Sequence, residues 1–551
     1  MKLNGSEILV KCLLEQGVDT LFGYPGGAVL NIYDALYKNR DKINHILTCH
    51  EQGAAHAADG YARATGKVGV CLATSGPGAT NLVTGIATAY MDSIPMVAIT
   101  GNVHKSLLGK DSFQEVDIAG ITMPITKHNY IVKDIKDLQN VLREAFYIAR
   151  KGRPGPVLVD ITKDVTGEIF EYEYKAPRSI KRSTEYITDS AIGKIADIIN
   201  ESKKPFIYAG GGIISSEAEK ELKKLAKKIK APVSSSLMGL SAYDGTDELA
   251  TGMIGMHGTK ASNLLAVECD VMLCIGARFS DRVIGRRDHI SNAQVIHIDI
   301  DPAEINKNIK SDCYVIGDIR EVLNKLLPLI DAKKNQNWGE RLVELKKTEE
   351  KVIETNTPQE LFKLLNEITN GDAIIVTDVG QHQMWTALSY KFKTPRTFIS
   401  SGGLGTMGFG LGAAIGAQFA VPEKNVILIT GDGSFAMNCN EVPTAIKSGL
   451  PLTIILLNNN ALGMVRQWQT LFYDKRYSST TLDRKTDFVK LVESFGGKGY
   501  RIMPEDNSYE ILSEAINSKE TVLVDYIIPS DDKVFPMVAP GSPIKDIILG
   551  E

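Results

Sequence analysis

The feature that most constrains the fold of this chain is a strand-like run, residues 426–430, that ends in the turn Gly431-Asp432-Gly433-Ser434. A second apolar run, residues 450–457, ends in the amides Asn458-Asn459. Polar residues that follow neighbouring buried strands gather at the carboxyl edge of a parallel sheet. A carboxylate and an amide there offer hard oxygen ligands and leave room for water, which suits Mg²⁺ holding a phosphate. The glycines would let backbone N–H groups approach the phosphate oxygens.

The number of residues between Asp432 and Asn459 resembles the spacing in the diphosphate–Mg²⁺ motif of thiamine diphosphate (ThDP) enzymes. Such chemistry also needs one buried carboxylate beside the aminopyrimidine ring, where a hydrogen bond favours the imino tautomer that deprotonates the thiazolium carbon. Glu51 fits this role, because the small residues that follow it predict a closely packed helix with Glu51 at its buried N-terminus. A metalloprotease site is excluded, since His50 and His56 are not spaced to share one helical face.

Composition narrows the class of protein. A chain of 551 residues is long enough for several domains. Its net charge of −4 gives no electrostatic case for binding nucleic acid or a membrane surface. Seven scattered cysteines without a Cys-x-x-Cys pair predict reduced thiols in a cytoplasmic protein. No apolar run is long enough to span a membrane, and early acidic residues argue against a signal peptide.

Short apolar runs alternate with helix-like segments, a pattern typical of parallel, doubly wound sheets. Polar stretches at residues 171–184 and 331–358 separate three such blocks. We therefore predict an α/β protein of three doubly wound parallel-sheet domains with boundaries 1–170, 190–330 and 358–551. The first and third blocks share the sequence of strand, glycine turn, helix and strand, and look like distant copies.

Several longer motifs are more specific. They are Phe22-Gly23-Tyr24-Pro25-Gly26-Gly27, Thr74-Ser75-Gly76-Pro77-Gly78-Ala79-Thr80-Asn81, Phe113-Gln114-Glu115, Gly276-Ala277-Arg278-Phe279, Gly402-Gly403-Leu404-Gly405-Thr406-Met407-Gly408 and Gly463-Met464-Val465-Arg466-Gln467-Trp468. With the Glu51 helix, they resemble the catalytic large subunits of acetohydroxyacid synthase, also called acetolactate synthase. The resemblance covers essentially the whole chain. It implies a pyrimidine-binding domain, a central FAD-binding domain and a diphosphate-binding domain.

For ThDP, the resemblance implies a site between the first domain of one subunit and the third domain of another. Glu51 would meet the pyrimidine ring, Gly27 and Gln114 would line the reacting face, and Met407 would hold the cofactor bent between its two rings. Mg²⁺ would be bound by the side chains of Asp432 and Asn459 and by the backbone carbonyl of Ala461. The other residues expected to bind the cofactor are Pro77, Asn81, Gly405, Gly431, Gly433, Ser434 and Met464.

Two glycine patterns suggest nucleotide binding. The run Gly403-Leu404-Gly405-Thr406-Met407-Gly408 matches the dinucleotide fingerprint, but the strand before it is short, and we reject that use. The central block instead carries glycines that would permit close approach of an extended ligand, an arginine that could pair with its phosphates, and acids that could accept hydrogen bonds from its ribose or ring groups. The resemblance implies that FAD is retained there without net redox chemistry, on Gly210, Gly211, Leu237, Met238, Met256, His257, Gly276, Arg278, Asp299, Ile300 and Asp318. Ser241 is a departure, because relatives often have glycine at this position.

The reaction implied is decarboxylation of pyruvate on ThDP and transfer of the hydroxyethyl carbanion to a second 2-oxo acid. Pyruvate as acceptor gives 2-acetolactate and 2-oxobutyrate gives 2-aceto-2-hydroxybutyrate, the first common step of valine, leucine and isoleucine biosynthesis. By the same resemblance, Arg282 would bind the acceptor carboxylate, Trp468 would shape its alkyl pocket, and Lys163 would lie near the substrate entrance.

Three alternatives stay open. A pyruvate oxidase shares all three domains, although residues 278–282 and 464–468 favour the synthase. A FAD-free catabolic acetolactate synthase would be excluded by a yellow, flavin-bearing preparation. A nucleotide-binding regulatory module without catalysis is disfavoured by the presence of both Glu51 and Asp432. The resemblance also implies a homodimer or homotetramer with a regulatory small subunit.

Overall fold

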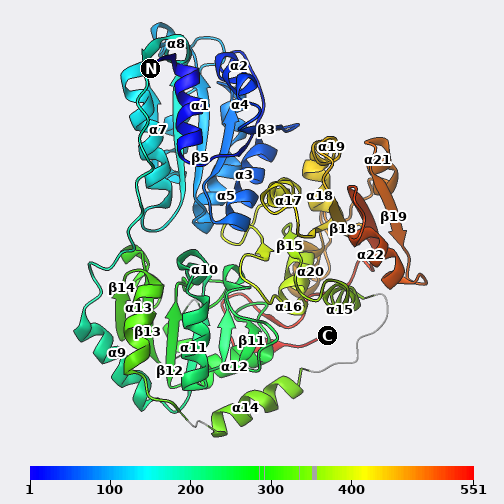
Figure 1. Ribbon diagram of the computed structural model, residues 1–551. Helices are drawn as coiled ribbons and strands as arrows, with labels where there is room; N and C mark the ends of the chain where they lie inside the picture. Colours follow the sequence, from blue (N-terminus) through cyan, green and yellow to red (C-terminus); the bar gives the residue numbers. More distant parts are fainter. Residues whose placement is uncertain (285, 291, 334–335, 350–356, 551) are drawn as a thin grey trace.

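The computed structural model describes residues 1–284, 286–290, 292–333, 336–349 and 357–550. Three sheets of six parallel strands organise these residues, with helices packed around each sheet (Figure 1). The prediction of three doubly wound α/β domains is therefore confirmed. Among the described residues, no helix combines the length and apolarity needed to cross a membrane.

The first sheet has the order β3-β2-β4-β5-β7-β6. Its strands are β2 (Thr20–Gly23), β3 (Asn44–Leu47), β4 (Gly69–Ala73), β5 (Met96–Asn102), β6 (His128–Val132) and β7 (Pro156–Thr162). The main helices around it are α1 (Gly5–Glu15), α2 (Leu30–Lys38), α3 (Glu51–Thr65), α4 (Pro77–Asn81), α5 (Val83–Asp92), α7 (Ile135–Arg150) and α8 (Lys163–Gly167). Short strands β1 (Lys2–Asn4) and β8 (Ile169–Glu171) pair antiparallel beside it.

The third sheet has the order β16-β15-β17-β18-β20-β19. Its strands are β15 (Ile374–Thr377), β16 (Phe398–Ile399), β17 (Val426–Gly431), β18 (Leu452–Asn458), β19 (Lys498–Ile502) and β20 (Val522–Ile527). Its helices are α15 (Pro358–Thr369), α16 (Gln381–Ser389), α17 (Phe409–Ala420), α18 (Asp432–Asn438), α19 (Val442–Lys447), α20 (Gly463–Phe472), α21 (Phe488–Ser494) and α22 (Ser508–Ile516). Numbered along the chain within each sheet, the first and third sheets have the same strand order, so the two domains share one topology, as the sequence pattern predicts.

The central sheet has the order β11-β10-β9-β12-β13-β14, the arrangement of dinucleotide-binding folds. Its strands are β9 (Pro205–Ala209), β10 (Val233–Ser235), β11 (Ala250–Met253), β12 (Val271–Ile275), β13 (Gln294–Asp299) and β14 (Cys313–Ile316). Its helices are α9 (Asp189–Glu201), α10 (Gly211–Ser216), α11 (Glu219–Ile229), α12 (Lys260–Glu268), α13 (Ile319–Leu326) and α14 (Gln336–Lys347). Helix α14 packs on this core through buried Trp338, whose indole N–H donates to the carbonyl of Pro205 at 2.9 Å.

The first and third domains pack directly through helices α3 and α17 (Figure 1). Both helices are rich in small residues along the contact. A Cβ at Gly416 would overlap the carbonyl oxygen of Ala57, and a Cβ at Gly60 would overlap that of Ala413. Only glycine permits this approach, which fixes the middle of α3 against the third domain.

Candidate active site

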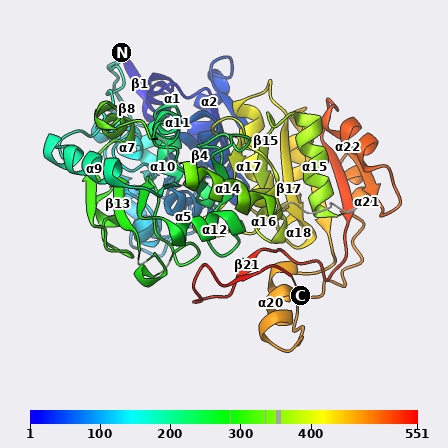
Figure 2. The same cartoon turned by 90° about the horizontal axis from the view of Figure 1, so that it is seen from below.

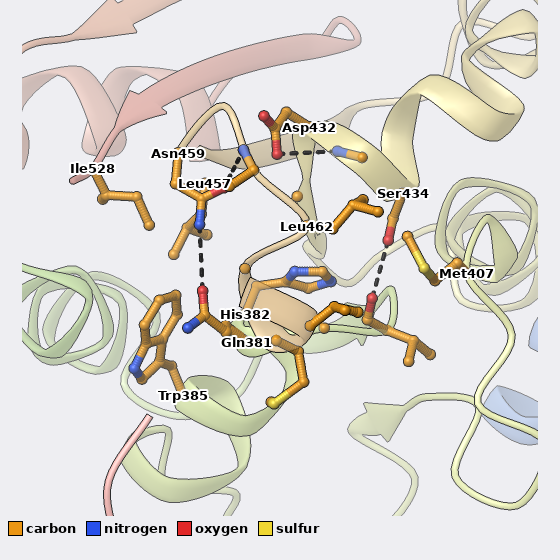
Figure 3. Close-up of a pocket in the computed structure, with 18 residues that line it drawn as sticks. Gln381, His382, Trp385, Met407, Asp432, Ser434, Leu457, Asn459, Leu462 and Ile528 are labelled. Atoms are coloured by element: carbon orange, nitrogen blue, oxygen red, sulfur yellow. Dashed lines mark hydrogen bonds between the residues drawn. The ribbon is translucent and has the colours of Figure 1, made fainter. Parts of the chain in front are cut away.

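A pocket lies at the carboxyl edge of the third sheet, where β15, β17 and β18 end (Figure 3). The predicted cofactor and metal residues that line it are Met407, Gly431, Asp432, Gly433, Ser434, Asn459, Ala461 and Met464. The sheet explains this gathering, because β17 is paired in parallel with both β15 and β18. Every residue that lines the pocket comes from the third domain.

Asp432 is the acidic centre of this pocket. It begins helix α18 and is only 4% exposed. Its Oδ1 accepts from the N–H of Gly433 at 3.0 Å, while Oδ2 has no hydrogen-bond partner within the described structure. Burial raises the pKa of the Asp432 carboxyl to about 6. A buried carboxylate with an unused oxygen is costly unless a cation or donor compensates it, so this residue fits a metal ligand.

The neighbouring donor set fits Mg²⁺ rather than a softer metal. Asn459 is buried, and its Oδ1 accepts from the N–H of Ala461 at 3.1 Å. Within the described ranges, no cluster of three or more His, Cys, Asp or Glu side chains could hold a metal ion. A cation beside Asp432 would therefore depend on one carboxylate, amide and carbonyl oxygens, water and ligand phosphates, which is the usual coordination of Mg²⁺.

Two further lining residues, Gln381 and His382, do not appear in the sequence prediction. They begin α16 directly after β15, in a third unit of strand, glycine turn and helix. His382 is buried, and burial lowers its pKa to about 3, so the ring is neutral at physiological pH. Its Nε2 has no partner in the parts of the chain that are described. The sequence signal was the repeated unit at residues 374–382, which resembles the one that holds Asp432.

The glycine run at residues 402–408 forms a turn that the first domain holds in place by hydrogen bonds, and it does not serve as a nucleotide-binding loop. Gly405 and Gly408 have φ angles of 68° and 88°, in the left-handed region that favours glycine. The buried carboxylate of Asp92 accepts from the N–H groups of Gly402 at 3.0 Å and Gly403 at 2.7 Å. The first domain thus positions the loop that carries Met407 to the pocket.

The predicted pyrimidine-side residues gather at the carboxyl edge of the first sheet. Glu51 begins α3 and is buried, as predicted, and its Oε2 accepts from the side-chain N–H of Asn81 at 2.9 Å. Pro77 begins α4, which ends at Asn81. Gln114 has a φ of 59° and lies beside Gly76, where a Cβ would come within 2.9 Å of the Gln114 backbone.

Gly27 and Lys163 lie at this edge as well. Gly27 follows β2 and is exposed, with open space where a Cβ would point. Lys163 begins α8 directly after β7, and its side chain is exposed. None of these residues, Glu51 included, lines the pocket that holds Asp432.

The third domain nevertheless sets the position of Glu51 within the same chain. The buried carboxylate of Glu441 accepts from the N–H of Cys49 at 3.0 Å and from the N–H of His50 at 2.8 Å. A Cβ at Gly53 would overlap this carboxylate. The first turn of α3 is therefore fixed by the segment that follows α18.

The residues predicted to bind FAD lie at the carboxyl edge of the central sheet. Gly210 and Gly211 follow β9, Gly276 and Arg278 follow β12, and a Cβ at Gly210 would overlap the carbonyl of Gly276. The same edge holds the remaining members of the set, at the end of their respective strands or after it: Leu237, Met238, Met256, His257, Asp299, Ile300 and Asp318. This glycine-lined switch point between β9 and β12 fits an extended dinucleotide.

The polar groups on this edge differ in whether they are free to form a hydrogen bond with a ligand. Burial lowers the pKa of His257 to about 4, and its Nδ1 has no partner among the described residues. Burial raises the pKa of Asp299 to about 6. Asp318 is already engaged, since it accepts from Arg182 at 3.0 Å and caps α13. Arg278 donates to the carbonyl of Met91 at 3.0 Å, which links the central and first domains.

Ser241, where the family pattern leads us to expect glycine, has a φ of 73°. A residue with a Cβ is strained in this left-handed conformation, and the Ser241 hydroxyl is buried without a partner in the described ranges. Ser241→Gly should therefore raise the free energy of unfolding by about 1 kcal/mol, measured by urea denaturation.

The matched control for Ser241→Gly is Ser235→Gly, because Ser235 is also buried but lies in strand β10 with ordinary backbone angles. This control should lose stability through the backbone entropy of glycine. A loss of stability in Ser241→Gly equal to that in the control would contradict the assignment of strain.

The predicted acceptor residues Arg282 and Trp468 are brought together from different domains. The guanidinium carbon of Arg282 lies 5.9 Å from the centroid of the Trp468 ring, within the range of a cation–π contact. The Arg282 side chain is largely exposed. Trp468 lies on α20 and lines a surface cavity together with Met464 and Tyr473.

Comparison with known proteins agrees with this architecture. Residues 3–121, 192–326 and 378–526 match the families described as the N-terminal TPP binding domain, the central domain and the C-terminal TPP binding domain of thiamine pyrophosphate enzymes. The chain is 49% identical to the "Probable acetolactate synthase large subunit" of Methanocaldococcus jannaschii, over 99% of this chain and 95% of that protein. It is 45% identical to the "Acetolactate synthase large subunit" of Haemophilus influenzae, over 100% and 99% of the two chains.

Proposed function

The chain belongs to the family of acetolactate synthase large subunits, and we propose on that premise that it forms 2-acetolactate from two molecules of pyruvate, and 2-aceto-2-hydroxybutyrate from pyruvate and 2-oxobutyrate. The observation that carries the proposal is the pocket around Asp432, whose unused carboxylate oxygen and neighbouring amides fit a metal-bound diphosphate. ThDP, when bound, supplies the nucleophilic carbon and the electron sink through which pyruvate loses CO₂ and its two-carbon unit reaches the acceptor.

On the diphosphate side, the proposed work of the chain is electrostatic. Asp432, Asn459 and the carbonyl of Ala461 would hold Mg²⁺, which neutralises the phosphate charge. The N-terminus of α18 would direct its free N–H groups at the phosphate oxygens, next to Gly433 and Ser434. His382 is neutral, and no described residue is hydrogen-bonded to its Nε2, so in its Nε2–H tautomer it would donate to a phosphate oxygen.

On the pyrimidine side, Glu51 would bind a ring N–H and move a proton between the ring and its own carboxylate. Asn81 keeps this carboxylate oriented by its 2.9 Å hydrogen bond, and Glu441 fixes the turn from which it projects. Because Glu51 does not line the Asp432 pocket of its own chain, we propose that a second copy completes each site, which makes the active enzyme at least a homodimer. Gly27 and Gln114 of the copy that supplies Glu51 would border the reacting face.

For the acceptor, Arg282 would pair with the carboxylate and Trp468 would form the wall beside the alkyl group. Their contact at 5.9 Å places a positive charge and an apolar ring side by side, as a carboxylate with an alkyl group would require. Lys163 lies at the open edge of the first sheet, where a positive charge would attract 2-oxo acids. Exclusion of water beside these residues would keep solvent protons from the reacting carbon until the acceptor arrives.

Trp468→Leu should cut the preference for 2-oxobutyrate over pyruvate by about tenfold or more, because truncating the ring widens the pocket that favours ethyl over methyl. Formation of 2-acetolactate from pyruvate alone should persist. The ratio of the two products in direct competition measures the effect. Tyr509→Leu removes an exposed ring from α22 and serves as the control. A product ratio equal to that of the wild type would leave Trp468 as a packing residue.

The central domain would retain FAD, which the strand order and the glycine edge favour. A pyruvate oxidase-like activity is the second candidate, since it would use the same three domains. Because the relatives of this chain are named large subunits, a regulatory small subunit is the expected partner. Location in the cytoplasm and the choice between dimer and tetramer stay predictions.

The proposal is tested by product analysis with pyruvate alone, in the presence of ThDP, Mg²⁺ and FAD. We expect 2-acetolactate and CO₂ from a preparation that carries flavin. Acetate or acetyl phosphate as the main product would support the oxidase instead.

A further inference from the structure

A chain of buried side-chain amides runs from the metal loop to the C-terminal segment. The Asn459 amide donates to Oε1 of Gln381 at 3.3 Å, and the Gln381 amide donates to Oε1 of Gln467 at 3.1 Å (Figure 3 shows the first of these). All three residues are buried, and Gln467 is only 2% exposed. Buried amides satisfied mainly by one another form a connected network, in which the position of each depends on the others.

Gln467 joins this network to residues 532–537. Its amide donates to the carbonyl of Val534 at 3.0 Å, and its Oε1 accepts from the N–H of Val534 at 2.9 Å. Gln381 donates to the carbonyl of Asp532 at 2.7 Å. The same segment continues into β21 (Met537–Val538), which lies beside α20 (Figure 2) and donates from Val538 to the carbonyl of Met256 at 2.8 Å.

The start of α20 is built against the same amides. A Cβ at Gly463 would overlap Oε1 of Gln381 and lie 2.6 Å from the amide nitrogen of Asn459. Glycine at this position is therefore required by the contact between the two side chains, since its conformation is otherwise ordinary. Helix α20 then carries Gln467 on its buried side and Trp468 toward the surface cavity.

We propose that Gln467 is a positioning residue that, through Gln381, couples the metal loop at Asn459 to the acceptor wall at Trp468 and to residues 532–538. Binding of the cofactor with its metal would fix Asn459, and the amide chain would then order α20 and the C-terminal segment beside the surface cavity that Trp468 lines. The inference deepens the proposed function and rests on it for the role of Trp468, but the coupling itself requires only that ThDP and Mg²⁺ bind at Asp432 and Asn459.

Hydrogen–deuterium exchange of the full-length protein, with and without ThDP and Mg²⁺, tests the coupling independently of product formation. In the wild type, adding both should slow exchange in residues 452–461 and in residues 532–538. In Gln467→Leu, the protection of residues 452–461 should persist, whereas that of residues 532–538 should fall by about tenfold or more. The preference for 2-oxobutyrate should fall in parallel.

Gln418→Leu is the matched control, because Gln418 is an equally buried amide of the same domain that donates to the carbonyl of Lys424 at 3.1 Å, outside the network. It should retain cofactor-dependent protection in both segments. Should Gln467→Leu fail to fold, Gln467→Glu keeps the size and the acceptor but loses the donor to Val534, and the same selective loss is expected.

Wild-type protection of residues 532–538 in the folded Gln467 variant would overturn the coupling. That outcome leaves the proposed function intact if the wild type forms 2-acetolactate. Conversely, coupled protection without acetolactate formation would reject the proposed function and keep the amide network.

Discussion

Glu51→Gln should slow exchange of the thiazolium proton of bound ThDP on the order of a hundredfold or more, the usual contribution of a positioned general acid or base. The amide has the size of the carboxylate and can still contact Asn81, but it cannot accept a proton from the pyrimidine ring. The affinity for ThDP should change little, because the site proposed for the diphosphate lies in the third domain. Quenched-flow exchange in D₂O, read by NMR of the released cofactor, measures the rate.

Glu7→Gln offers a matched control, since Glu7 also lies in the first turn of a helix of the same domain, as the capping partner of Asn4. Its exchange rate should equal that of the wild type. A Glu51→Gln protein that exchanges the thiazolium proton at the wild-type rate would remove Glu51 from the proposed chemistry.

Asp432→Ala is expected to weaken ThDP and Mg²⁺ binding together, by about a hundredfold or more, because it removes the only charged protein ligand proposed for the metal. The effect on stability should have opposite signs with and without ligand. Burial raises the pKa of Asp432 to about 6, above its unfolded value, so above that pH the ionised carboxylate destabilises the ligand-free fold. Thermal melting at pH 8 should therefore show an equal or higher Tm for the ligand-free variant and a smaller gain on adding ThDP and Mg²⁺.

Asp372→Ala is the control, because it removes a carboxylate that lies outside the pocket. Asp372 is exposed and pairs with Lys424. This variant should bind both ligands as the wild type does. If titration of Asp432→Ala with Mg²⁺ gave the wild-type dependence of ThDP binding, the metal site would have to lie elsewhere.

The parts of this structure that were predictable from sequence are those with local signals. Residues 426–434 combine a buried strand with a glycine turn and an acid, so both the strand end and the position of Asp432 follow from the pattern. The alanine-rich segment after Glu51 likewise predicts a closely packed helix, and the structure shows that its partner is α17. Parallel strand order then brings Asn459 to the edge that holds Asp432.

Contacts between distant segments could not be predicted in this way. Gln467 is hydrogen-bonded to Val534, and Arg278 is hydrogen-bonded to Met91. Both contacts depend on how distant segments pack, and no local sequence pattern around either residue predicts them. His382 differs, because it follows a strand and a glycine at the start of a helix, a local pattern from which its position could have been predicted. Helix α14 could also have been predicted, since the buried residues Trp338, Leu342 and Leu345 recur at helical spacing within a stretch that is otherwise polar.

The central claim is that this chain joins two 2-oxo acids through a carbon–carbon bond. The most direct measurement supplies pyruvate that is isotopically labelled at its keto carbon, together with unlabelled 2-oxobutyrate, ThDP, Mg²⁺ and FAD, and follows the label by NMR. We predict that the label appears in the acetyl carbonyl of 2-aceto-2-hydroxybutyrate, with a smaller amount in 2-acetolactate. Label confined to acetate, acetyl phosphate or acetaldehyde would contradict the account.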